Sequence, residues 1–165
     1  MRGTFLGAAL GVLPILLRER KFHLPWRLDR DTAIRLGGSI LFGGILGPLA
    51  LLAGLRLSPA ASVSMWLNLE TVFTALLGHF IFKDFLTPRS WAAAGGILFA
   101  AVLLATGEGA AGVQAGILVA LACLCWGLDN HFTALIDGIT PAESTFWKGL
   151  AAGSTNLLIG LSLAP

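Results

Sequence analysis

The sequence predicts an all-α, polytopic bundle of about six membrane-spanning helices. Of its 165 residues, 56% are hydrophobic and only 12% are charged, which is about half the charged fraction of a typical soluble domain. The apolar residues gather in successive segments of roughly 20 residues, the length that a helix needs to cross the hydrocarbon core of a bilayer. The 21 glycines suit helices that must approach closely where no hydrophobic effect draws them together.

The first two expected spans enclose the longest polar stretch of the chain. Residues 3–17 form a short apolar segment, and Pro14 lies near its end, where the loss of a backbone hydrogen bond is tolerable. The stretch 18–35 is charged and is expected to be a water-exposed loop. The second span is expected at 36–55, with a glycine-rich face for close helix contact and a kink at Pro48.

A hydroxyl residue followed by proline marks the start of each of the next two spans. Ser58 is expected to cap a third span over 58–82, with Pro59 at the first helical position. Thr87, also followed by proline, repeats this signal and begins a fourth span that runs to about residue 106. The third span is the stretch around which the rest of the chain is organised, because it carries an acid in its apolar interior.

The last two expected spans follow a glycine-containing break at residues 107–109. A fifth span is expected at 114–135. The segment Thr140-Pro141-Ala142-Glu143 has the pattern of a capping box, in which the threonine and the glutamate each satisfy a backbone N–H of the other. It predicts the start of a sixth span that reaches the C-terminus.

The distribution of basic residues predicts the orientation of the helices. Loops on one side are 18–35, 83–87 and 136–140, and those on the other are 56–58 and 107–113. The first set contains the basic residues Arg18, Arg20, Lys21, Arg27, Arg30, Arg35 and Lys83, whereas the second contains only Arg56. Basic residues concentrate in cytoplasmic loops, so we expect the first set to be cytoplasmic and the protein to lie in the inner cell membrane.

Glu70 is the strongest single functional candidate. It lies near the middle of the third span, where a carboxylate costs at least a few kcal/mol and should face protein or a water-filled cavity. Trp66 precedes it by one helical turn, and Thr74 follows it by one turn. Such a stripe suits the wall of a small-molecule pocket or a polar pathway. The alternative is that Glu70 is a structural acid and that the stripe is ordinary interhelical packing.

A second polar group lies at the end of the fifth span and in the sixth. By helix rise, Asp129 lies roughly 12 Å and Lys148 roughly 10 Å from the connection between their two helices. Because the helices should be antiparallel, we expect the two charges at matching depth and predict an ion pair. In the alternative, Lys148 extends to the cytoplasmic interface while Asp129 borders it.

Several classes of function lack their sequence signals. A net charge of +2 is too small to indicate nucleic-acid binding. Cys123 and Cys125 are two residues apart on a helix, a spacing that suits neither a disulfide nor a shared metal, and no other metal-ligand cluster or cofactor motif occurs. The chain has no hydrolase motif and no phosphate-binding loop. We therefore expect neither an enzyme nor a cofactor.

Two segments resemble a known family. The first, residues 67–77, reads Leu-Asn-Leu-Glu-Thr-Val-Phe-Thr-Ala-Leu-Leu, and the second, residues 84–91, reads Asp-Phe-Leu-Thr-Pro-Arg-Ser-Trp before a glycine-rich span. They resemble the EamA domain of the drug/metabolite transporter superfamily. Cys125-Trp126-Gly127, followed by Asp129 and Asn130, is similar to the Trp-Gly helix that opens the second repeat of that family. This chain has Thr71 where the family often has proline.

The resemblance implies a ten-span transporter built from two inverted five-helix repeats with a substrate cavity between them. On that plan, residues 1–106 are the first repeat without its first span, 107–113 are a linker on the non-cytoplasmic side, and 114–165 begin the second repeat. We therefore expect a fragment of a longer chain, or else a chain that pairs with another copy.

The resemblance also implies the function: transport of a small metabolite or drug-like molecule by alternating access. Its lipid-embedded site would take a small-molecule substrate and a coupling proton or ion, and a homodimer is possible. The expected cavity residues are Trp66, Asn68, Glu70, Thr74, Trp126 and Asn130, and the expected gate residues are Asp129 and Lys148. The alternative is a non-transporting membrane assembly subunit whose polar residues only lock helices together.

Overall fold

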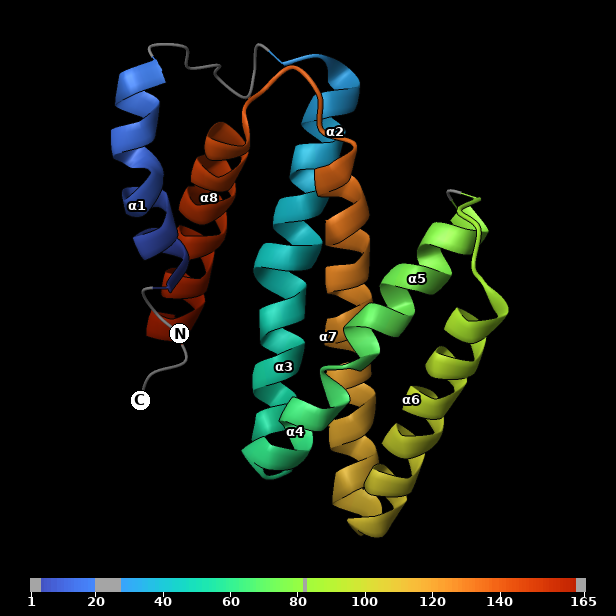
Figure 1. Ribbon diagram of the computed structural model, residues 1–165. Coiled ribbons are helices and arrows are strands. Elements are labelled where there is room, and N and C mark those ends of the chain that lie inside the picture. The colour runs from blue at the N-terminus through green and yellow to red at the C-terminus, as the bar shows by residue number, and fades with distance from the viewer. Residues whose placement is uncertain (1–3, 20–27, 82, 163–165) are drawn as a thin grey trace. The chain divides into compact units, whose positions relative to one another are not determined.

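The computed structural model describes residues 4–19, 28–81 and 83–162, and these residues form helices joined by short connections (Figure 1). In chain order the helices are α1 (Thr4–Glu19), α2 (Arg30–Ser39), the π-helix η2 (Ile40–Leu46), α3 (Gly47–Leu55), α4 (Ala60–Trp66), α5 (Leu69–Ile81), α6 (Pro88–Gly107), α7 (Gly109–Ala134) and α8 (Pro141–Ser162).

Four helical stretches among the described residues are long and apolar enough to cross a membrane: Arg30–Leu55, Ala60–Ile81, Pro88–Gly107 and Gly109–Ala134. These stretches confirm the predicted all-α polytopic class. The first and sixth expected spans correspond to α1, which contains a shorter apolar stretch, and to α8, which has 22 residues but is more polar.

The capping signals that the sequence predicts for two helices are confirmed. Thr87 caps α6, since its hydroxyl accepts a hydrogen bond from the backbone N–H of Ser90 at 3.2 Å. At α8 the Glu143 carboxylate accepts from the Thr140 N–H at 2.8 Å, and the Thr140 hydroxyl accepts from the Glu143 N–H at 3.2 Å. The predicted capping box is therefore present in both directions.

Three predicted helix boundaries are wrong. Helix α4 begins at Ala60 and has Pro59 as its N-cap, because the Ser58 hydroxyl is engaged elsewhere, with Glu108. The polar stretch 18–35 is helical from Arg30, where the Asp29 side chain caps α2; residues 20–27 lie outside the described residues. Helix α7 begins at Gly109 rather than near residue 114. Gly109 has a φ of 73°, a conformation that suits glycine, and so the chain turns within one residue.

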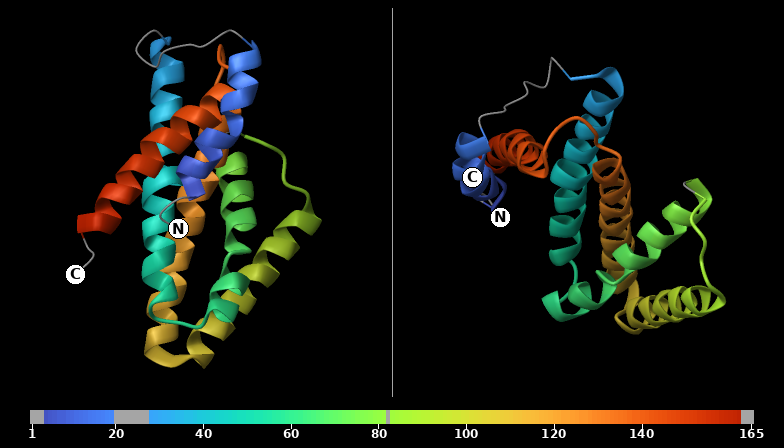
Figure 2. Two further views of the ribbon diagram at one scale, coloured as in Figure 1. Left: turned by 90° about the vertical axis from the view of Figure 1, so that its left-hand side faces the viewer. Right: turned by 45° about the horizontal axis from the view of Figure 1, so that its top comes forward.

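The chain divides into two compact units, residues 1–45 with 132–165 and residues 46–131. In the first unit α1 packs along α8, as Figures 1 and 2 show. Here the Asn156 amide of α8 donates a hydrogen bond to the Gly44 carbonyl of η2 at 2.7 Å. That carbonyl would bond to residue 48 in an α-helix, but Pro48 has no N–H. Asn156 therefore replaces the missing donor.

The second unit contains a buried apolar core between α3, α4, the start of α5 and α7. Its buried residues are Leu51, Val63, Trp66, Leu69, Ala115, Val119, Ala122 and Cys123. Helix α6, by contrast, has no buried residue, although it packs against α5 at its N-terminal end. There Trp91 meets the ring of His79 edge-on, with 5.4 Å between the ring centroids. These compact units are defined by contacts and are not the two sequence repeats, which stay a prediction.

Candidate functional site

The third expected span is interrupted just before Glu70. The prediction of one continuous helix over 58–82 is wrong, because α4 ends at Trp66 and α5 begins at Leu69 (Figure 1). The backbone N–H groups of Asn68, Glu70 and Thr71 bond three residues back, at 3.1–3.2 Å, instead of four. The Asn68 side-chain amide also donates to the Met65 carbonyl at 2.9 Å. Such local bonding of an asparagine competes with the helix and explains the break.

A buried cysteine of α7 lies against this interruption. The Cys123 sulfur is 3.7 Å from the Trp66 carbonyl oxygen and 3.8 Å from that of Leu67. The thiol is fully buried and free, and it can act as a weak donor to both carbonyls; the Leu67 carbonyl also accepts from the Glu70 backbone N–H at 3.1 Å. The sequence analysis gave this cysteine neither a disulfide nor a shared metal with Cys125, and the structure adds the contact with the break.

Helices α5 and α7 approach each other at Gly127. A Cβ at Gly127 would lie 3.2 Å from the Thr74 backbone nitrogen and 3.2 Å from the Leu77 Cδ1 atom. Only a residue without a side chain allows the two backbones to come this close without displacing Thr74. The glycine of the Trp-Gly helix thus brings polar side chains of α5 and α7 into contact.

Three of the predicted cavity residues meet along this contact. The Asn130 side-chain amide donates to the Glu70 carboxylate at 3.2 Å and to the Thr74 hydroxyl at 3.4 Å. Glu70 and Thr74 are half-buried, and Asn130 is exposed. We call Glu70, Thr74 and Asn130 the polar seam. A carboxylate held by an amide and still partly accessible can bind a cation or a polar group that donates hydrogen bonds.

His131, near the end of α7, extends the polar seam. Its Nε2 atom lies 3.0 Å from the Thr74 backbone oxygen. A carbonyl oxygen only accepts hydrogen bonds, so Nε2 must carry the hydrogen. The only signal in the sequence was that His131 follows Asn130 directly, and no sequence spacing reveals which residue of another helix lies opposite.

Two of the other predicted cavity residues, Trp66 and Asn68, hydrogen-bond to groups outside the polar seam. Trp66 is 1% exposed, and its indole N–H donates to the Ala101 carbonyl of α6 at 3.1 Å. Its ring lines a groove of about 270 Å³ between α4, α5, α6 and α7, whose walls are almost entirely apolar. Asn68 is exposed and bonded to its own helix, and Trp126 is half-buried on α7. Their cavity roles stay predictions.

The two residues of the predicted ion pair belong to different compact units. Asp129, 8% exposed, belongs to the second unit, and Lys148, half-buried, belongs to the first. The pairing of the two residues stays a prediction.

A second carboxylate binds α4 at the opposite end from the interruption. Glu108, the residue between α6 and α7, accepts hydrogen bonds from the hydroxyls of Ser58 and Ser62. These two bonds lower the pKa of Glu108 from its ordinary value of 4.5. Ser62 lies in the first turn of α4, and Ser58 lies just before that helix.

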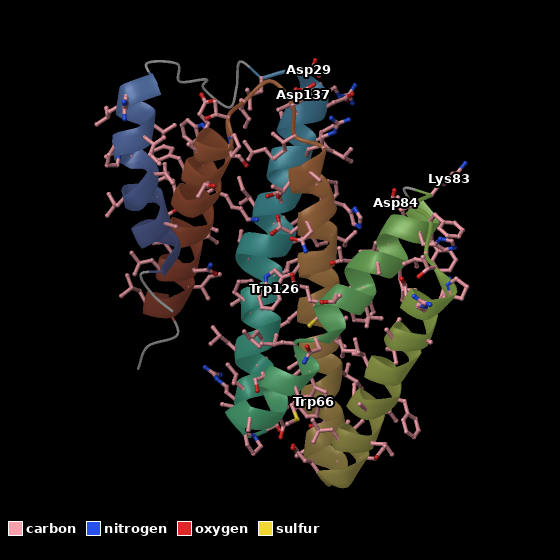
Figure 3. The ribbon with its side chains drawn as sticks, in the orientation of Figure 1. Asp29, Trp66, Lys83, Asp84, Trp126 and Asp137 are labelled. Carbon is pink, nitrogen blue, oxygen red and sulfur yellow. The ribbon has the colours of Figure 1, made fainter. Side chains whose placement is uncertain are left out.

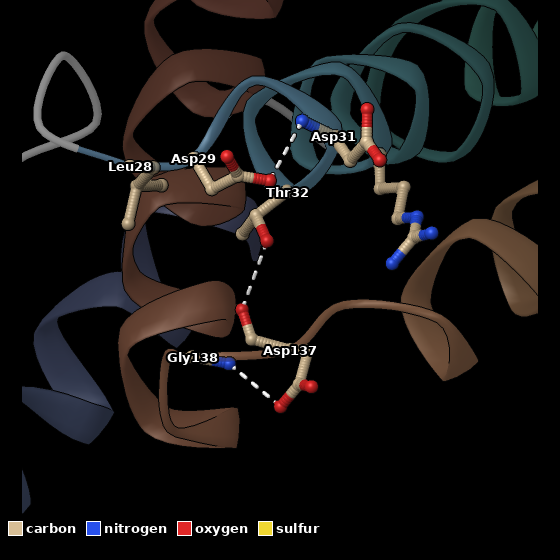
Figure 4. A pocket seen from close by; sticks show the side chains of 7 residues that line it. Leu28, Asp29, Asp31, Thr32, Asp137 and Gly138 are labelled. Carbon is tan, nitrogen blue, oxygen red and sulfur yellow. Dashed lines mark hydrogen bonds between the residues drawn. The ribbon is translucent and has the colours of Figure 1, made fainter.

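The first unit contains a polar pocket of about 420 Å³ at the start of α2 (Figure 4). The Thr32 hydroxyl donates to the Asp137 carbonyl at 3.0 Å, and the Arg35 guanidinium donates to the Leu135 carbonyl at 2.6 Å. Three aspartates, Asp29, Asp31 and Asp137, line the pocket. Both bonds go to backbone carbonyls, so their evident effect is to hold the connection between α7 and α8 against α2.

The described residues contain no group of three or more His, Cys, Asp or Glu side chains placed to hold a metal ion. What they do contain is a set of apolar helices long enough to span a membrane, one of them broken just before Glu70. This is the architecture of a multi-pass membrane protein.

The chain belongs to the EamA-like transporter family, whose model matches residues 3–106. It is also 32% identical over 126 residues to a protein of Methanothermobacter thermautotrophicus described as an uncharacterized transporter. The match covers 72% of this chain and 36% of that relative, so the matched part of the chain spans about a third of the relative's length. No solved structure matches the chain.

Proposed function

We propose that the protein is a secondary transporter that moves a small metabolite or drug-like molecule across the cell membrane by alternating access. The family and the transporter-named relative support this class. The single observation that carries the site assignment is the Asn130–Glu70 hydrogen bond beside the broken helix. Interrupted helices near the middle of the membrane are where secondary transporters bind their substrates.

The chemistry of the polar seam favours a substrate with hydrogen-bond donors. Glu70 and the Thr74 hydroxyl are acceptors directed at Asn130, and a ligand amine or hydroxyl could replace the amide as their donor. The apolar side chains around the seam would accommodate the rest of a small molecule. The proposed substrate is therefore a small molecule that carries an amino or hydroxyl group.

The proposal extends to topology and coupling. The basic loops 18–35, 83–87 and 136–140 would be cytoplasmic in the inner cell membrane. Asp129 and Lys148 would pair near the cytoplasmic gate, and a coupling proton or ion would drive transport. A homodimer is a further possibility that the resemblance raises.

A non-transporting assembly subunit is the second candidate. The observation that favours it is that the Glu70 carboxylate is already bonded to a neighbouring helix, as a residue that only locks helices would be. In that case the seam would stabilise the bundle and bind nothing.

Transport measurements on the full-length protein in proteoliposomes distinguish the two candidates. The probes are a panel of radiolabelled amino acids and amine-containing sugars. We expect the wild type to take up at least one probe. We expect Glu70→Gln to lower its uptake about tenfold or more, because a hydrogen bond to a charged group is worth roughly 1.5–3 kcal/mol.

The matched control is Glu108→Gln, which makes the same change in a carboxylate distant in sequence from the seam and should leave uptake unchanged. Equal uptake by wild type and a correctly folded Glu70→Gln variant would contradict the role of Glu70. Failure of the wild type to move any probe would favour the assembly subunit.

A further inference from the structure

Helix α6 packs against α5 and α4 at separate points along its length. At its N-terminal end the Trp91 ring meets those of His79 and Phe80 edge-on, with centroids 5.4 Å and 6.2 Å apart. Further along, the Ala101 carbonyl accepts the hydrogen bond from Trp66, which is labelled in Figure 3 and is the last residue of α4. The groove of about 270 Å³ lies along the C-terminal half of α6, and all its lining residues belong to the second compact unit.

The groove stays open because small residues line much of it. An added Cβ on Gly116 of α7 would lie 3.4 Å from the Ala105 Cβ atom and 3.6 Å from the Trp66 ring. Ala101, Ala105 and Ala120 contribute no more than a methyl group each. Helices α4, α6 and α7 therefore come close together here, but their side chains do not fill the space between them.

The groove has no free hydrogen-bond donor for a ligand. Two of its lining side chains carry a donor, those of Trp66 and Thr106. The Trp66 N–H donates to Ala101, and the Thr106 hydroxyl donates to the carbonyls of Val102 and Leu103 in its own helix. A polar ligand would lose its hydrogen bonds to water and find few in exchange, so the groove suits an apolar occupant.

The apolar surface of α6 continues into the groove. This helix is long and apolar enough to cross a membrane and has no buried residue. Leu98 and Val102 line the groove, while Phe99 and Leu103, the next residues along, are exposed outside it. The groove is therefore continuous with a surface that faces the hydrocarbon of the bilayer.

The length of the groove matches one leaflet of a bilayer. From Leu98 to Thr106 it follows α6 for about 12 Å, at 1.5 Å per residue. One leaflet contains about 15 Å of hydrocarbon, half of a core of roughly 30 Å. The Thr106 end lies beside the turn that carries the charged Glu108, and the Leu98 end lies near the middle of the span. This is the direction in which a lipid chain runs from its headgroup.

We propose that the groove binds one acyl chain of a bilayer lipid from the leaflet on the side of the α6–α7 turn. The chain supplies contact atoms to walls that would otherwise border a void. Leu69 and Phe73 of α5 line the groove, whereas the residue after each of them, Glu70 and Thr74, belongs to the polar seam. Successive residues of a helix point about 100° apart, so the lipid site and the seam use different faces of α5. The proposal requires only that the helices span a membrane and is independent of the proposed function.

Photo-crosslinking tests the lipid site residue by residue. The probe is a phosphatidylcholine with a diazirine at the end of one acyl chain, in nanodiscs that contain the full-length protein and no other small molecule. Mass spectrometry locates the label after illumination. Phe99 and Leu103 are exposed on α6 and serve as the reference, because any surrounding lipid reaches them. Leu69 is buried except toward the groove, so a chain that enters the groove is what labels it.

We expect label on Leu69 and Phe73 in the wild type, at a yield similar to that of the reference residues. Ala120→Phe should lower the ratio of groove label to reference label about tenfold, because the added ring occupies the space of the chain and a packed site does not admit both. The matched control is Ala100→Phe, the same change at an exposed position of α6 outside the groove, which should leave the ratio unchanged.

The proposal is overturned if the wild type is labelled on Phe99 and Leu103 but not on Leu69 or Phe73. In that case another helix of the full-length chain, or a second copy, covers the groove. A wild-type ratio in a folded Ala120→Phe variant would also overturn it. If that variant does not fold, Val113→Trp replaces it: Val113 is exposed and lines the groove, and the larger side chain should lower the ratio about threefold by obstructing the space. An unchanged ratio there counts equally against the lipid site.

Discussion

Two membrane helices of this protein are interrupted, and a different kind of side chain contacts the backbone carbonyls at each interruption. In the stretch Arg30–Leu55 the break is the π-helix before Pro48, where the Asn156 amide donates to the Gly44 carbonyl at 2.7 Å. In the stretch Ala60–Ile81 the break is at residues 67–68, where the Cys123 thiol lies 3.7–3.8 Å from two carbonyls. An amide is a strong donor and a thiol a weak one.

The comparison suggests why the polar seam begins at the second break. A strong donor secures the first interruption as part of the packing. At the second, Trp66 of α4 and Leu69 at the start of α5 lie in the apolar core, while the next residue, Glu70, is half-buried and accepts a hydrogen bond from Asn130. Because only the weak thiol donor of Cys123 contacts the carbonyls at the second interruption, α5 is freer to adjust its position relative to α4, as a binding site requires.

The largest effect tests how Trp66 holds α4, the helix that ends at the second interruption, in the apolar core. Trp66→Ala removes a side chain that is 1% exposed and bonded to Ala101. It should lower the free energy of unfolding by about 3–5 kcal/mol. Trp66→Phe keeps most of the ring and loses only the N–H donor, so its loss should be about 1 kcal/mol. Reversible unfolding in detergent micelles measures both, and similar losses for the two variants would show that α4 is not anchored by packing.

The next largest effect tests the hydrogen bond from the Asn156 amide to the Gly44 carbonyl at the first interruption. Asn156→Leu conserves volume but removes the donor to the Gly44 carbonyl, so it should destabilise by about 1–3 kcal/mol in the same assay. Ser154→Ala is the control on the same helix, because the Ser154 hydroxyl is exposed and bonds only within α8. A loss no larger than that of the control would mean that another group satisfies Gly44.

A pH-dependent effect tests how the start of α4 is held. The pKa of Glu108 is lowered in the folded protein by the Ser58 and Ser62 hydroxyls, so its stabilising contribution is fully present above pH 4.5 and is lost as the pH falls through the lowered pKa. The melting temperature of the wild type should therefore exceed that of Glu108→Gln at pH 7, and the gap should narrow below pH 4.5.

The double variant Ser58→Ala/Ser62→Ala is the control for this prediction. In that background the two hydroxyl donors are gone, and Glu108→Gln should no longer have a pH-dependent effect. A gap that stays constant from pH 7 to pH 3 would contradict the assignment of the pKa shift to the serines.

The smallest effect tests the contact between the Cys123 thiol and the carbonyls at the second interruption. Cys123→Ser keeps a small donor next to the Trp66 and Leu67 carbonyls, and we expect a change in stability of less than about 1 kcal/mol. Cys123→Ala should destabilise more than Cys123→Ser but less than Asn156→Leu. If Cys123→Ala proves the most damaging of the three, the thiol is a stronger support of the break than its distances indicate.

Much of the architecture could be predicted from local sequence signals. The hydropathy of the segments predicted the helices, and Thr87 and the Thr140–Glu143 box predicted where two of them begin, because a cap depends on residues that are close in the chain. The helix starts at Ala60 and Gly109 were missed, since each depends on a contact or a backbone conformation that residue type alone does not decide.

The site was predicted only in part for the same reason. Glu70 could be recognised from its own sequence position, because an acid in an apolar span is conspicuous wherever its partners lie. That Asn130 and Thr74 are bonded to one another, that His131 joins them and that Trp66 does not could be seen only once Gly127 had brought α5 and α7 together.

The sequence by itself determined the class of the protein, its family and the identity of its most unusual residue, since these follow from composition, local order and the cost of a charge in lipid. Only the tertiary structure decided where the spans break, which side chains of other helices contact the carbonyls there, and that Asn130 bonds to Glu70 and Thr74. The physical reason is that these features depend on pairs of atoms from different helices, and the spacing along one helix carries no information about the residue opposite.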